Sequence, residues 1–377
     1  MLKPVLSSLM LLFWMNTNAQ IYVNPGVDTS AQDVQLALKF YNDYIAEFKG
    51  KRLPDLSKYW PSEELQQRTI PDQLIYAISD YPLYSQGYYP TILYIKPTAK
   101  YIHLKTQFAF ADSTKNIMTM AVTNHYVSFN RKKIPYFINP LSININTWGN
   151  RTIRNITFYY PPYHDFDIHR ADSLISNVKK LEKSWDLKPI NIRYYLANSQ
   201  DELQQLRGFD FALAMGNKDK PSGISDDTDN QVFCGGLGEN YFHEVVHVYL
   251  NRQYPESPLK EGLAVFYGGS MGRSINWHLK RVSRYLHQHP ESDLNNLADF
   301  WYPDPYTNPG SAICGLICSM VYKTKGIAGL KRLMTYDNLQ DIFEKELNVK
   351  SGNWNVYLRK IIDEEASKVE NKRHVTN

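Results

Sequence analysis

The spacing of apolar residues changes along the chain, and these changes constrain the fold more than any other feature. Apolar side chains recur at helical spacing from Val34 to Phe48. From Pro90 the chain is rich in Ile, Thr, Tyr and Phe with partial alternation, which is typical of strands. After Glu239 it is mostly helical in pattern. This order predicts an α+β protein in which a helix and an antiparallel sheet precede a strand-rich lobe and a helical lobe.

Length and turn residues indicate two domains. The 377 residues exceed the usual size of one hydrophobic core. The polar, glycine-containing stretch from Thr147 to Thr152 predicts a boundary, with an accessory α+β domain at residues 20–148 and a second domain at 149–377. The topology expected for the first domain resembles the cone-shaped α+β rolls of the nuclear-transport-factor-like superfamily. Its sequence shows no cluster of acid, base and nucleophile.

The second domain opens with alternating elements. Strands are expected at 153–162 and 190–197 with a helix at 170–185 between them, and short strands at 209–217 and 231–236. Ser199 followed by Glu202 forms a capping box that predicts the start of another helix.

Composition excludes several classes of function. Apolar residues make up 43% and charged residues 21% of the chain, which describes a globular and not a disordered protein. The net charge of +4 is spread without a long basic run, so it gives no argument for nucleic acid or an anionic membrane as a partner. The 28 tyrosines suit half-buried sheets and polar binding clefts.

The first nineteen residues predict a secretory signal peptide. Lys3 precedes an apolar run from Val5 to Met15, and small residues lead to a cleavage site after Ala19. The run has about 11 residues, whereas a membrane anchor needs roughly 20. No later stretch is expected to span a bilayer. We therefore expect an exported protein, periplasmic or extracellular.

The three cysteines do not make a disulfide framework, since their number is odd. Cys314 and Cys318 lie four residues apart on a helix that we expect to be buried, where both thiols would serve in apolar packing. Cys234 precedes the histidine motif by nine residues and is a weak candidate for a metal ligand.

The motif His243-Glu244-Val-Val-His247 is the main candidate for chemistry. Residues four apart project from one face of a helix, so the two imidazoles can bind one metal ion. Glu244 is rotated by about 100°, where it can act as a general base without being a ligand. The alternative is a pair of histidines on a surface helix with no metal.

A catalytic zinc site needs a third protein ligand. The residues after His247 contain neither the glycine nor the histidine of the enzymes that bind zinc through three histidines. Glu261 is favoured instead. The first helix is expected to run about six residues past His247, and a second helix with Ser257 as its N-cap and Pro258 as its first residue would return Glu261 to the level of His247. Glu256 lies in that turn and ranks lower.

The sequence HEVVH followed by EGLAVF resembles the gluzincin metallopeptidases, the peptidase MA-like group that includes aminopeptidase N and thermolysin. The resemblance implies a zincin-like domain, Zn²⁺ held by His243, His247 and Glu261, and Glu244 as general base in the hydrolysis of peptide bonds. Val265 stands where thermolysin-like enzymes carry an aspartate that contacts the site.

Two other segments extend the resemblance to aminopeptidase N. The segment around Tyr306 implies that this tyrosine stabilises the oxyanion, with Tyr302 or Tyr322 as alternatives. The stretch LAMGN, residues 213–217, resembles a substrate-binding strand, but Gly216 replaces the glutamate that binds a free amine there. A strict aminopeptidase is therefore not implied, although the strand could pair with a substrate backbone.

Three functional hypotheses follow. The first is an exported zinc metallopeptidase with a peptide or protein substrate. The second is a catalytically idle relative whose first domain binds a partner or a glycan, and the third is a histidine pair without metal. The presence of Glu244 favours the first, because a purely structural zinc site needs no base.

Overall fold

A computed structural model of the chain describes residues 21–48, 54–77, 81–213, 215, 220–297, 300 and 304–368. The predicted signal peptide lies outside these residues. Helix accounts for 42% and strand for 21% of the chain, which confirms a protein that mixes the two. The chain forms two compact units. The first contains Met1–Ser62, Asp72–Asn139 and Asp210–Leu213, and the second contains Glu63–Pro71, Pro140–Phe209 and Ala214–Asn377.

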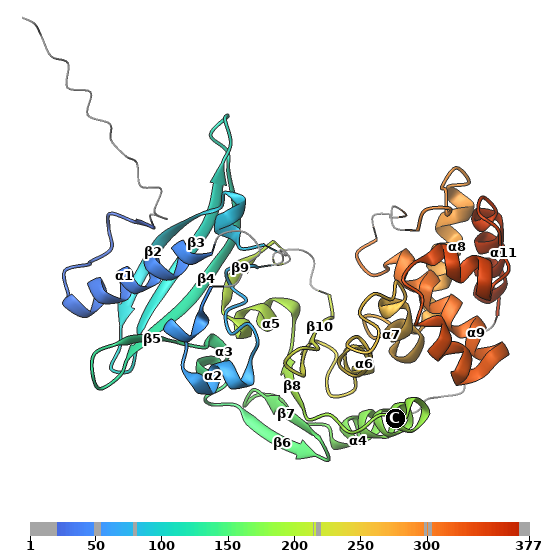
Figure 1. Cartoon of the computed structure of the whole chain (residues 1–377), viewed down its shortest axis with the longest axis horizontal. Helices are drawn as coiled ribbons and strands as arrows, with labels where there is room; N and C mark the ends of the chain where they lie inside the picture. Colours follow the sequence, from blue (N-terminus) through green and yellow to red (C-terminus); the bar gives the residue numbers. More distant parts are fainter. Residues whose placement is uncertain are drawn as a thin grey trace, which may run out of the picture. The chain divides into compact units, whose positions relative to one another are not determined.

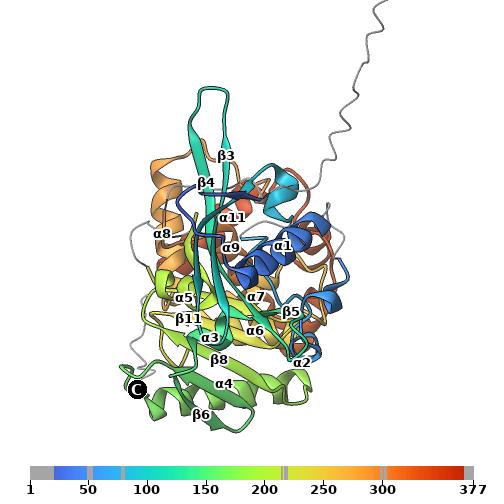
Figure 2. The same ribbon diagram turned by 90° about the vertical axis from the view of Figure 1, so that its left-hand side faces the viewer.

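The first unit is built on a six-stranded sheet (Figure 1). The strands follow the order β1-β2-β3-β4-β5, and β9 also pairs with β4. Their bounds are β1 Tyr22–Val23, β2 Tyr89–Pro97, β3 Ile102–Ala111, β4 Ile117–Phe129, β5 Pro135–Ile138 and β9 Phe209–Ala212. Pairing is antiparallel from β2 to β5 but parallel between β1 and β2, so the sheet is mixed and not wholly antiparallel as predicted. The long β3–β4 hairpin is clearest in Figure 2.

Helix α1 (Gln32–Glu47) lies on this sheet through the apolar stripe that its sequence predicts. The ring of Tyr44 lies 4.6 Å from that of Phe137 on β5. The unit also buries a polar group that the sequence did not reveal, in which Nε2 of His125 lies 3.0 Å from Oδ2 of Asp72. Both side chains are almost fully enclosed, so this pair is part of the core. The short elements here are η1 Leu56–Lys58, α2 Ser62–Gln67 and η2 Leu83–Gln86, and residues 63–67 of α2 belong to the second unit.

The second unit contains a five-stranded sheet in the order β10-β11-β8-β7-β6. The bounds are β6 Gly149–Ile153, β7 Ile156–Tyr160, β8 Ile192–Ala197, β10 Ser222–Asp226 and β11 Gln231–Gly235. The three central strands β7, β8 and β11 are parallel, while β6 and β10 are antiparallel edge strands. The single strand predicted at 153–162 is therefore a hairpin, in which Arg154 has a positive φ of 56° at the turn.

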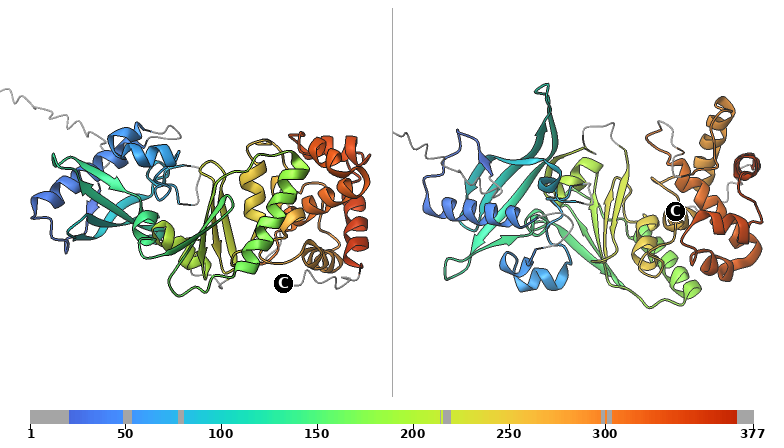
Figure 3. Two further views of the ribbon diagram at one scale, coloured as in Figure 1. Left: turned by 90° about the horizontal axis from the view of Figure 1, so that it is seen from below. Right: turned by 45° about the horizontal axis from the view of Figure 1, so that its top comes forward.

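Helices cover both faces of this second sheet. Helix α5 (Gln200–Arg207) and α3 (Pro140–Asn144) pack on one face, where Leu203 and Leu206 meet Tyr195. The predicted cap is confirmed, since the Ser199 hydroxyl accepts from the amide of Glu202, but the Glu202 carboxylate accepts from the amide of Asn198 and not from that of Ser199. Helix α4 (Ile168–Trp185) lies on the other face with α6 (Phe242–Leu250), as the left panel of Figure 3 shows.

The remaining helices continue this second core. Their bounds are α7 Lys260–Gly268, α8 Ile275–Gln288, α9 Pro309–Leu333, α10 Leu339–Asp341, η3 Ile342–Glu346 and α11 Trp354–Ala366. Helix α9 is long and apolar enough by composition to cross a membrane, contrary to the sequence-based expectation, but half of its apolar window is buried within the unit. Gly326 interrupts it with a φ of 59°. The chain from β11 to α9 thus places α6 between the sheet and the helical part.

Candidate metal centre

Helix α6 carries both predicted histidines and is buried along its whole length. His243, Glu244 and His247 are 5%, 6% and 4% exposed. Its apolar residues Val245, Val246 and Tyr249 are buried as well and anchor the helix in the core. Buried polar side chains need polar or ionic partners, so their surroundings decide what this helix can do. The alternative of a histidine pair on a surface helix does not describe this arrangement.

Helix α7 supplies Glu261, although the turn before it differs from the prediction. Helix α6 ends at Leu250 instead of running about six residues past His247, and α7 begins at Lys260, two residues later than predicted. The Ser257 hydroxyl accepts weakly from the amide of Leu259 at 3.4 Å and is not the N-cap. Glu261 therefore lies in the first turn of α7.

The two histidines and Glu261 converge on one point. Their Nε2 atoms are 3.2 Å apart, and the Glu261 oxygens lie 3.3 Å from Nε2 of His247 and 3.6 Å from that of His243. A tetrahedral zinc ion with bonds of about 2.0–2.1 Å separates its ligand atoms by roughly 3.3 Å. Among the described residues, these three form the one group of three or more histidine, cysteine or acidic side chains close enough to bind a metal ion. Glu256 is not in it.

Each imidazole makes a hydrogen bond through its Nδ1 atom, so that its Nε2 atom faces the point where the three side chains converge. Nδ1 of His243 donates to the carbonyl of Gly269 at 2.6 Å, since a carbonyl can only accept. Nδ1 of His247 lies 3.1 Å from Oδ1 of Asn251, which accepts in the same way. In this tautomer both Nε2 atoms carry lone pairs and face a carboxylate. Two imidazole nitrogens and one carboxylate at these distances could hold a cation, and this set of donors fits Zn²⁺.

The electrostatics of the site also favour a positive charge. Burial opposes ionisation of Glu261, but hydrogen bonds donated by the protonated forms of His243 and His247 outweigh it and hold the pKa of the carboxyl well below its usual range. Burial also disfavours charge on His247, yet the hydrogen bond and the charge of Glu261, with the charge of Glu244, raise its pKa. The Glu261 side chain is 62% exposed, so the site is open to solvent on that side.

Glycines allow α7 to approach its neighbours closely enough to present Glu261. A Cβ on Gly268 would lie 2.4 Å from the backbone nitrogen of His243, and one on Gly262 would lie 2.4 Å from Cβ of Cys314 on α9. Real Cβ atoms do not approach other atoms so closely. The glycines of residues 261–269 therefore allow α7 to pack closely against both α6 and α9.

Glu244 points to a different side of α6, toward the edge strand β10. A Cβ on Gly223 of β10 would lie 2.6 Å from Oε1 of Glu244 and 2.3 Å from Cε1 of Tyr241. The backbone of β10 thus runs directly past the carboxylate. In the described part of the chain no strand pairs with the outer edge of β10. Sequence analysis did not identify Gly223, for which the only signal is a glycine inside a strand.

The groups that orient the histidines differ from those of thermolysin-like enzymes. Val265 is buried at 2% exposure and packs on Gly315, so it has no polar role. Gly269 and Asn251 act in its place. Asn251 could have been found from its position one turn after His247 on the same face, whereas a backbone carbonyl leaves no signal in a sequence.

A further layer holds the carbonyl of Gly269 in place. The next carbonyl, that of Ser270, accepts from Nε2 of His278 on α8 at 3.0 Å, and Nδ1 of His278 lies 3.1 Å from the hydroxyl of Thr307. His278 is buried, and burial lowers its pKa. This network joins α8 and the segment before α9 to the loop that orients His243.

Neither described tyrosine of the three proposed to stabilise an oxyanion makes a hydrogen bond or ring contact with His243, His247 or Glu261. Tyr306 is half-buried, and its amide donates to Oδ1 of Asp304 at 2.8 Å. Tyr322 is 46% exposed on α9, with its ring 5.4 Å from that of Phe266. Tyr302 lies outside the described residues, as does most of the stretch 213–217. The choice among the three tyrosines stays a prediction.

The other candidates have structural partners. The buried Cys234 thiol donates to the carbonyl of Gly238, and burial raises its pKa to about 12. Cys314 and Cys318 are buried free thiols on α9, as predicted. Nε2 of His164 lies 2.7 Å from the buried carboxylate of Glu239. This contact holds the segment before α6 in place.

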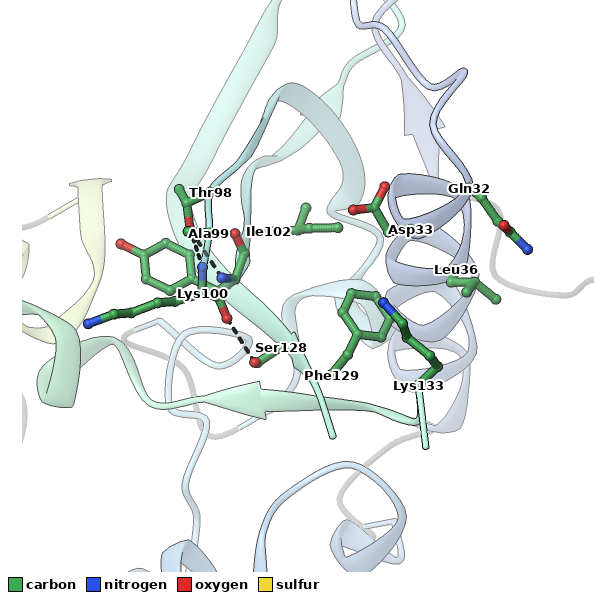
Figure 4. Close-up of a pocket in the computed structure, with 11 residues that line it drawn as sticks. Gln32, Asp33, Leu36, Thr98, Ala99, Lys100, Ile102, Ser128, Phe129 and Lys133 are labelled. Carbon is green, nitrogen blue, oxygen red and sulfur yellow. Dashed lines mark hydrogen bonds between the residues drawn. The ribbon is translucent and has the colours of Figure 1, made fainter. Parts of the chain in front are cut away.

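The first unit contains a separate cavity of about 370 Å³ (Figure 4). It lies between the start of α1 and the turns that join β2 to β3 and β4 to β5. Its hydroxyl groups are used within the protein, since Thr98 donates to the carbonyl of Tyr101 and Ser128 to that of Lys100. Asp33 is the acidic residue of its lining, and no histidine or cysteine accompanies it. This cavity offers no metal ligands comparable to those of α6 and α7.

Comparisons of the chain with protein-family models, with curated proteins and with solved structures give no match. The function must therefore be argued from the site.

Proposed function

We propose that this chain is an exported zinc-dependent metallopeptidase of the gluzincin type, whose second unit is a zincin-like domain. The observation that carries the proposal is the convergence of two lone-pair-bearing imidazoles and one carboxylate at distances suited to tetrahedral zinc. The general base predicted beside them, Glu244, supports a catalytic role, since a structural zinc site has no need of a carboxylate there.

His243, His247 and Glu261 would hold the ion, with Gly269 and Asn251 fixing the two imidazoles. Zinc bound there would polarise a scissile carbonyl and lower the pKa of a water molecule. Glu244 takes a proton from the attacking water and passes it to the leaving amine. Tyr306 is the proposed hydrogen-bond donor to the oxyanion.

The edge strand β10 suggests how a peptide would bind. An extended substrate can add to the free edge of a sheet through backbone hydrogen bonds. Because β10 passes Glu244 at Gly223, a peptide paired with this edge would place a backbone carbonyl next to the base. We assign this role to Ser222–Asp226. Most of the stretch 213–217, predicted from sequence to pair with a substrate, lies outside the described residues.

Zinc content and cleavage test the proposal in two steps. Full-length protein should bind a single zinc ion per chain, Glu261→Gln should lose it, and Glu256→Gln should keep it as a matched control on the same turn. A chain that binds no zinc would refute both the peptidase and the idle relative. With zinc bound, Glu244→Gln should lower peptide cleavage by about 10²- to 10⁴-fold. Zinc binding without any cleavage by the wild type would favour the idle, partner- or glycan-binding alternative.

Export is tested separately. Expression with the native N-terminus should yield a protein outside the cytoplasm that begins at Gln20, as read by mass spectrometry. A retained Met1 would contradict the proposed signal peptide.

A further inference from the structure

A cavity of about 600 Å³ in the second unit lies beside the metal centre. Tyr241, Gly268 and Gly269 line it. Tyr241 stacks on the imidazole of His243 with 5.6 Å between ring centroids and 8° between planes. Gly269 provides the carbonyl that orients the same imidazole. The cavity therefore adjoins the backbone and the ring that support the first metal ligand.

The same cavity adjoins the start of the edge strand. Tyr241, which lines it, also contacts Gly223 of β10. Gly236, another lining residue, has its Cβ position 3.8 Å from Cα of Pro221, the residue before β10. A peptide that pairs with β10 beside Glu244 would reach this cavity at the Ser222 end of the strand.

The charge of the cavity is positive. Within the described ranges, its lining contains Arg170 and Arg273 and no acidic side chain. Neither guanidinium makes an ion pair among the described residues. Arg170 is held in place by a hydrogen bond from Nη2 to the carbonyl of Leu237, which uses one of its five donors. Arg273 is exposed, with its guanidinium 5.6 Å from the ring centre of Trp277. Two unpaired guanidinium groups in one cavity favour a carboxylate ligand, which arginine binds in a bidentate manner.

We propose that this arginine cavity, lined by Arg170 and Arg273, is a substrate subsite that selects a carboxylate, from either an acidic side chain or the C-terminus of the peptide. The inference rests on the proposed peptidase function and names its substrate class. Both arginines reach solvent, so the preference is moderate and weakens as salt screens the charges.

Matched peptides measure the preference. One series moves a single Glu along a neutral sequence, with Gln at the same position as reference, and a second series compares C-terminal acids with amides. The two series distinguish a side-chain carboxylate from a terminal one. Wild-type protein should prefer the carboxylate at one position by about fivefold in kcat/KM, the size expected for a solvent-exposed ion pair.

Variants of Arg273 assign the preference to the cavity. Arg273→Gln should bring the ratio close to one, and Arg273→Glu should favour Lys over Glu at the same position. Arg284→Glu makes the same charge change on the exposed side of α8, outside the cavity, and should keep the wild-type ratio. Zinc content and thermal unfolding show whether each variant is folded.

Two results would overturn the inference in different ways. Cleavage of neutral peptides with no carboxylate preference, or with a preference unchanged in both Arg273 variants, refutes the subsite and leaves the peptidase in place. If zinc-loaded wild type cleaves no peptide at all, the proposed function fails and the subsite with it.

Discussion

Replacing Gly223 by alanine tests whether the distance between β10 and Glu244 matters for catalysis. The new Cβ would lie 2.3 Å from Cε1 of Tyr241 and 2.6 Å from Oε1 of Glu244. Ordinary contact begins near 3.4 Å, so strand and helix must separate by about 1 Å or the carboxylate must turn away. Among the described strands, the edge strand β10 is paired on one side only, so we expect it to shift while α6, which carries His243 and His247, keeps its position.

We expect kcat/KM for a peptide to fall about hundredfold, because a displacement of about 1 Å in a catalytic group has an effect of that order. Overpacking should also lower the free energy of unfolding by about 1–3 kcal/mol. Zinc content should stay at the wild-type value, since α7 and the Nδ1 partners of both histidines are unchanged.

Peptide cleavage, zinc content and thermal unfolding are measured together. Gly310→Ala is the control, because a Cβ there meets its nearest atoms at ordinary distances of 3.5 and 3.6 Å. An alanine variant at position 223 that cleaves peptides at the wild-type rate would refute the reasoning. Loss of zinc from this variant would also contradict it, since the disturbance would then reach the ligands.

Three other predictions follow from single contacts. Asn251→Ala should lower zinc affinity about 10- to 100-fold in a chelator competition, because Nδ1 of one ligand loses its acceptor. His125→Leu should lower the free energy of unfolding by about 3 kcal/mol in denaturant titration, since the buried carboxylate of Asp72 loses its imidazole partner and keeps the amide of Leu74 as a donor. The hydrogen bond from Arg332, with weaker help from Lys325, lowers the pKa of Glu346 from 4.5 to about 2. Its stabilisation is therefore present above pH 4.5 and lost as pH falls toward 2, so the melting temperatures of wild type and Glu346→Gln should converge over that range.

The sequence alone predicted those features of the fold that depend on residues close together in the chain. The stripe of α1, the cap of α5 and the burial of α6 follow from side chains within a few positions of one another. The shared face of His243 and His247 follows from the helical repeat alone. These features could be predicted because backbone geometry relates residues that are close in the chain.

Tertiary structure decided the features that join distant residues. Strand β9 pairs with β4, some ninety residues earlier in the chain, because sheet edges pair in space and not in sequence. Glu261 lies beside the two histidines despite errors in both predicted helix ends, since the close approach permitted by Gly262 and Gly268 decides where α7 lies. The carbonyl of Gly269 was beyond prediction, because every residue has one and only packing selects which faces an imidazole. Sequence thus determined which side chains could bind a metal. Tertiary packing decided which groups orient His243 and His247 and which strand passes Glu244.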